Sequence, residues 1–98
     1  MNMDRDPRYE HIREKIEQGN IRSFNDIFFF IPKTVVANDL GKKVDRFNDM
    51  MEHVEKFTLE DLYQLAKHCK INGMDMLVLV DKEYNKQLNR AKKRANSD

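Results

Sequence analysis

The sequence predicts an all-α protein, and three observations support that prediction. Apolar residues recur at spacings of three and four along most of the chain, which is the period of one face of a helix. Only three glycines and two prolines interrupt the 98 residues, and so few turn residues favour helices over a sheet. Ser23 and Thr58 each precede an apolar run and are followed three residues later by an acid, as helix N-caps are.

The first expected helix spans residues 7–18. Pro7 suits the first turn, where a missing backbone N–H costs nothing. Tyr9, Ile12 and Ile16 form one apolar stripe on the helix. Gly19 can then adopt the left-handed conformation that ends many helices.

Ser23 begins a second expected helix, which Pro32 ends after Ile31. The Phe-rich run could instead be a buried strand, but a cap formed by Ser23 and Asp26 favours the helix. A helix this short buries one stripe. We therefore expect one of the three side chains of residues 28–30 to face solvent or a partner, unless the helix over residues 7–18 covers it.

Two short helices follow, over residues 34–40 and 44–52, with Gly41 in the turn between them. Thr58 caps the next helix, whose apolar stripe ends at Cys69, and Asn72 is the expected cap of a last helix. The methionines include Met50, Met51, Met74 and Met76, and most of them are expected to fill the core. The other expected core residues of this region are Val36, Ala37, Leu40, Phe47, Leu62 and Leu65.

Composition and charge exclude several classes of protein. One cysteine excludes an internal disulfide framework and a multi-cysteine zinc site. No apolar run is longer than that of residues 27–31, which is too short to cross a bilayer, and the polar start of the chain is no signal peptide. We therefore expect a soluble, cytoplasmic protein. Residues 82–94 carry six basic residues and one acid, which suggests a polyanion partner or a helix end solvated by lysines.

The helix pair around Gly41 has the spacing of a helix-turn-helix. The stretch TVVANDLGKKVDRFNDMM, followed by FTLEDLYQLAKHCKINGMDML, resembles the Cro and lambda-repressor-like (XRE) family. Ala37-x-x-Leu40-Gly41, Phe47 and the segment 58–66 carry the resemblance, which covers residues 22–80. It implies a compact five-helix domain that binds double-stranded DNA, often as a dimer. Residues 1–21, an added helical extension, and 81–98, a basic helical tail, lie outside it.

The resemblance also implies which residues contact DNA. The expected base-edge residues are Val44, Asp45, Arg46 and Asn48, with Arg46 suited to guanine and Asn48 to adenine. The expected phosphate contacts are Lys33, Lys42 and Lys43. Lys33 stands where the family commonly has glutamine, and Asp45 and Asp49 repel phosphate. The alternative is that these residues form an ordinary solvated helix face.

Two functions follow as expectations. The first is sequence-specific DNA binding by a small transcriptional regulator, acting as a homodimer. The alternative is a protein-interaction module that keeps the helix-turn-helix fold without DNA binding, which the mildly acidic residues 1–81 favour. No phosphate loop, Ser-His-Asp arrangement or metal-ligand spacing is evident, so we expect no enzyme activity, cofactor, metal or small-molecule substrate.

Overall fold

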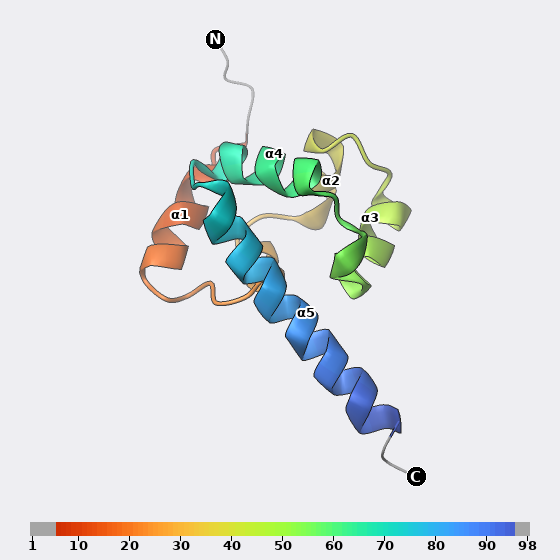
Figure 1. Cartoon of the computed structure of the whole chain (residues 1–98). Coiled ribbons are helices and arrows are strands. Elements are labelled where there is room, and N and C mark those ends of the chain that lie inside the picture. Colours follow the sequence, from red (N-terminus) through yellow and green to blue (C-terminus); the bar gives the residue numbers. More distant parts are fainter. Residues whose placement is uncertain (1–5, 96–98) are drawn as a thin grey trace.

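The chain folds as a set of helices, shown in the computed structural model of Figure 1. The structure describes residues 6–95, so the outer parts of the predicted extension (1–5) and tail (96–98) lie outside the described residues. Within that range there are helices and no strand, which confirms the all-α prediction. In chain order they are α1 (Tyr9–Glu17), the 3-10 helix η1 (Phe24–Phe29), α2 (Lys33–Asp39), α3 (Val44–Glu52), the 3-10 helix η2 (Val54–Lys56), α4 (Leu59–Cys69) and α5 (Gly73–Ala95).

The predicted N-caps are present. The Thr58 Oγ accepts a hydrogen bond from the backbone N–H of Asp61 at 3.0 Å, and the Asp61 carboxylate accepts one from the Thr58 N–H at 3.1 Å. The Asp26 carboxylate accepts from the Ser23 N–H at 3.1 Å. Asn72 Oδ1 accepts from the backbone N–H three residues on, at 3.0 Å. These bonds satisfy N–H groups that the first turn of a helix leaves without partners.

The Phe-rich segment differs from the expected α-helix over residues 24–31. It is a 3-10 helix that ends at Phe29, with the Phe30 N–H bonded to the Ile27 carbonyl. This tighter helix is common in short connecting pieces. Phe29 is 78% exposed, whereas Phe28 and Phe30 are half-buried, so one phenylalanine does face outward, as predicted. Helix α1 packs on α4 instead and leaves Phe29 uncovered.

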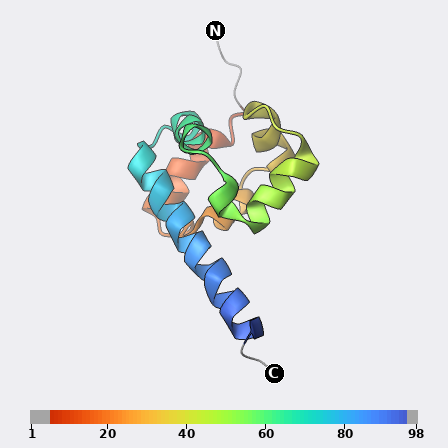
Figure 2. The same ribbon diagram turned by 45° about the vertical axis from the view of Figure 1, so that its right-hand side comes forward.

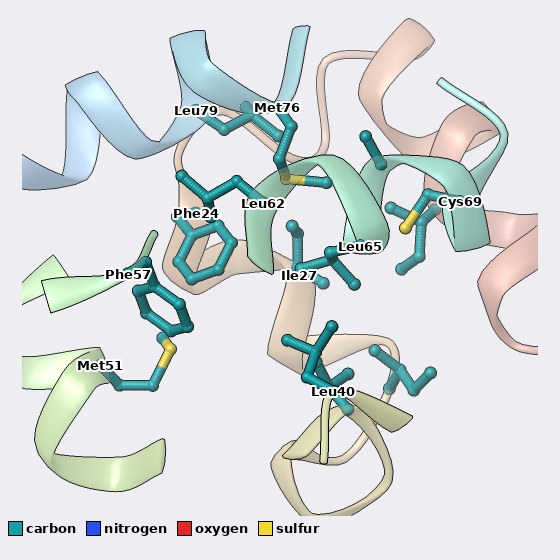
Figure 3. Packing of buried hydrophobic residues seen from close by; sticks show 14 of the residues in the cluster. Phe24, Ile27, Leu40, Met51, Phe57, Leu62, Leu65, Cys69, Met76 and Leu79 are labelled. Atoms are coloured by element: carbon teal, nitrogen blue, oxygen red, sulfur yellow. The ribbon is translucent and has the colours of Figure 1, made fainter. Parts of the chain in front are cut away.

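The core lies around α4, where side chains from η1 and α5 converge on it (Figure 3). Phe24, Phe28, Phe47 and Phe57 form a closed cycle of four edge-to-face pairs, with ring centroids 5.3–5.8 Å apart. This cycle joins η1 to α3 and to the start of α4. All the core residues predicted for this region are buried: Val36, Ala37, Leu40, Phe47, Leu62 and Leu65. Of the methionines considered as core residues, Met50, Met51 and Met76 are buried, whereas Met74 is 63% exposed.

Helix α5 is longer than the body that it packs against. Its N-terminal part, up to Gln87, packs on α4, η1 and η2. The last turns extend past them, as Figures 1 and 2 both show. The molecule is correspondingly elongated, with principal extents of 56, 31 and 21 Å. The predicted basic tail is thus the continuation of a core helix.

Candidate nucleic-acid interface

Helices α2 and α3 pack against each other across a tight turn. Gly41 has φ +71°, a conformation that other residues adopt only at a cost, and its N–H bonds to the Asn38 carbonyl at 3.0 Å. The Lys42 N–H bonds to the Ala37 carbonyl at 2.8 Å. Ala37 and Phe47 are fully buried between the helices and the core. The turn and these two side chains therefore fix the direction of α3.

The outer face of α3 carries three of the four residues predicted to contact base edges. Asp45, Arg46 and Asn48 are exposed, and Val44, in the first turn, is half-buried. Asp45, Asp49 and Glu52 follow one another at spacings of four and three, so they form a row along the exposed side. The helix therefore presents hydrogen-bonding groups outward on a surface with more acids than bases.

Asp49 is paired with a residue outside the helix. The Lys56 Nζ lies 2.7 Å from its Oδ2. This hydrogen bond lowers the pKa of the Asp49 carboxyl, with smaller effects of the charges of Lys56, His53 and Arg46. Arg46 is exposed and forms no ion pair at salt-bridge distance within residues 6–95, although its charge acts on the nearby Asp49 carboxyl.

The three predicted phosphate lysines are not equivalent. Lys33 and Lys43, at the beginnings of α2 and α3, are exposed. The Lys42 Nζ instead lies 3.2 Å from the Asp61 Oδ1, and its side chain is only 18% exposed. Asp61 therefore caps α4 and also binds the turn lysine. Lys42 would have to leave this pair to reach a phosphate.

Sequence analysis missed how α5 is attached to the body. The Glu83 carboxylate accepts from the Asn25 N–H at 2.9 Å. The Gln87 side chain donates to the Met51 carbonyl at 2.8 Å and accepts from the Val54 N–H at 3.2 Å. Both residues continue the buried stripe of Met76 by helical spacing, and this was the available signal.

A groove separates the second half of α5 from α3. Its volume is about 870 Å³, and Lys33 and Asn48 line it together with Arg90 and Arg94 of α5. The structure thus brings two of the predicted site residues together with two arginines that sequence analysis did not assign to the site.

The cysteine, a residue type that could act as a nucleophile or metal ligand, is part of the core. Cys69 is buried, and burial raises the pKa of its thiol to about 12, so it is held as a neutral thiol. Among residues 6–95 no three His, Cys, Asp or Glu side chains gather closely enough to hold a metal ion. Within the same range no helix has the length and apolar character needed to cross a membrane.

The comparisons with known proteins found nothing similar. No family model, curated protein or solved structure matches this chain.

Proposed function

We propose that this protein binds double-stranded DNA in a sequence-specific manner, with α2 and α3 as a lambda-repressor-like helix-turn-helix and α3 in the major groove. The observation that supports this most is the outward presentation of Arg46 and Asn48 on a helix that Gly41 and Phe47 hold in place. Arginine and asparagine are the side chains that pair bidentately with guanine and adenine. A small transcriptional regulator is the role that fits such binding.

The phosphate contacts proposed here come from Lys33 and Lys43, which are exposed at the starts of the two helices. Phosphate contacts set the register of a protein on DNA, whereas base contacts provide specificity. Lys42 is the weakest candidate of the three, because Asp61 already binds it.

Selection from a random duplex library, followed by quantitative binding to the enriched site, tests the proposal. Arg46→Ala should cost about 1–3 kcal/mol on the enriched site and little on random duplex. Arg13→Ala on α1 is the matched control, because it removes the same charge from an exposed arginine on a different helix. If no sequence is enriched, the proposal fails.

A second candidate is a protein-interaction module, and the acidic row on α3 favours it. Asp45, Asp49 and Glu52 are exposed on the face that would meet DNA, and only Asp49 has a cationic partner among the described residues. A basic protein surface would be attracted to such a row, whereas phosphate is repelled. Under this alternative, charge reversal of Asp45 and Glu52 abolishes partner binding, and no duplex is bound at physiological salt.

A further inference from the structure

The second half of α5 carries a continuous row of cations. We call residues 82–95 the basic arm. Lys82, Lys86, Arg90 and Arg94 are each four residues apart, so they lie along one side of the helix over about 18 Å. Like charges at this spacing destabilise a helix in water. The only acid in the arm, Glu83, is buried and lies 3.8 Å from the Arg90 guanidinium, so no exposed acid of the arm alternates with the cations of the row.

The arm is held in a defined direction relative to the body. The Lys86 Nζ donates to the buried Ser23 Oγ at 2.9 Å. Glu83 and Gln87 bind the backbone of Asn25, Met51 and Val54 at 2.8–3.2 Å. Bonds from three residues in two successive turns of α5 therefore fix where the last two turns, with Arg90 and Arg94, point.

That direction places the arm beside the candidate interface. Arg90 and Arg94 line one wall of the 870 Å³ groove that Lys33 and Asn48 also line. Glu52 and Glu55 lie on the body side of the same groove. The cations of the groove lie on the arm and at the start of α2, whereas its acids are Glu52 at the end of α3, Glu55 in η2 and the buried Glu83 of the arm. Arg90 is 60% exposed and meets Glu83 only at 3.8 Å, so its guanidinium can reach a ligand in the groove.

We propose that Arg90 and Arg94 bind backbone phosphates of the duplex that α3 contacts, so that the arm provides the ionic attraction that α3 lacks. This inference rests on the proposed DNA-binding function. A row of cations with no interspersed exposed acid matches a polyanion of regular charge, and Lys33 and Asn48 place the duplex at this groove.

The test uses the full chain and a short mixed-sequence DNA duplex, with fluorescence anisotropy over a range of salt concentrations. The variant is Arg90→Gln with Arg94→Gln. The control is Lys92→Gln with Lys93→Gln, which removes the same charge from the same helix at exposed positions that neither belong to the row nor line the groove. Far-UV circular dichroism checks that both double variants stay helical.

Loss of two phosphate contacts should lower the slope of log K against log salt by roughly 1.8, and should weaken binding about 60-fold at roughly 0.1 M salt. The affinity of the control variant for the duplex should fall by less than about fivefold. If both double variants lose affinity equally, net charge alone is responsible and the inference is overturned. An unchanged slope in the arginine variant overturns it as well.

The outcomes also separate this inference from the proposed function. If Arg46→Ala loses site preference while the arginine double variant matches its control, DNA binding stands and the role of the arm fails. If the unaltered chain does not bind duplex at low salt, both fail. If the arm arginines bind polyglutamate but are irrelevant to duplex affinity, the arm serves an acidic protein and the inference is overturned.

Discussion

Replacement of Phe47 by alanine should remove most of the stability of the fold. The ring is fully buried on α3 and makes edge-to-face contacts with Phe28 and Phe57, at 5.8 and 5.6 Å between centroids. Truncation of a buried phenylalanine costs about 3–5 kcal/mol, from lost burial and from the cavity that remains. A small domain has only about 5–15 kcal/mol in total. The same change breaks two of the four pairs of the aromatic cycle, so the orientation of α3 is affected first.

Urea denaturation followed by circular dichroism measures the loss, and thermal melting gives a second estimate. The expected decrease in Tm is roughly 12–40 °C, at about 4–8 °C per kcal/mol for a domain of this size. Phe29→Ala is the matched control, because the same atoms are removed from a side chain that is 78% exposed. That variant should stay within about 0.5 kcal/mol of the parent. Equal melting of the two variants would show that Phe47 is not in the core and that the direction of α3 is wrong.

Three further outcomes are expected. Lys42→Met should lower the free energy of unfolding, measured by urea denaturation, by about 1–2 kcal/mol, because the buried Asp61 loses its cationic partner. Lys43→Met, at an exposed site, should leave the free energy of unfolding almost unchanged. The unfolded Cys69 thiol ionises near pH 8.5 and the folded one near pH 12, so the stability of the parent should fall by about 1 kcal/mol between pH 8 and 9.5 relative to Cys69→Ala; parallel pH profiles would contradict this. We also expect a homodimer through the exposed Phe29, so sedimentation at micromolar concentration should show a dimer for the parent and a monomer for Phe29→Ser; a monomeric parent would refute it.

Local and periodic features of this chain could be predicted from sequence. The caps at Thr58 and Asn72, the positive φ of Gly41 and the burial of Phe47 each depend on residues a few positions apart. The bounds of α3 were predicted for the same reason. The 3-10 geometry of residues 24–29 was not, because a short apolar run fits either type of helix.

Features that depend on tertiary contacts could not be predicted in this way. Lys42 and Asp61 are nineteen positions apart, and only the packing of the turn against α4 brings them together. Glu83 and Gln87 are polar residues on the side of α5 that faces the body. A prediction from hydrophobic periodicity alone would end the core before them. They face the body because backbone N–H and C=O groups of η1, η2 and the end of α3 need partners, and the only signal of this requirement in the sequence of α5 is their helical spacing from Met76.

Asp49 and Glu52 belong to the same acidic row on α3, but we expect their replacement to affect duplex binding differently. Glu52 lines the groove beside the basic arm and has no cationic partner among residues 6–95, whereas the charge of Asp49 is already compensated by Lys56 at 2.7 Å. If phosphate approaches through the groove, Glu52→Gln should tighten duplex binding several-fold at low salt, because a repulsive charge is removed there. Asp49→Asn makes the same change in net charge, but Asp49 does not line the groove, so this variant should tighten binding less. Anisotropy titrations of the two single variants measure the difference. Unchanged or weaker duplex binding by Glu52→Gln would show that phosphate does not approach this acid, and would contradict the groove as the place where the duplex lies.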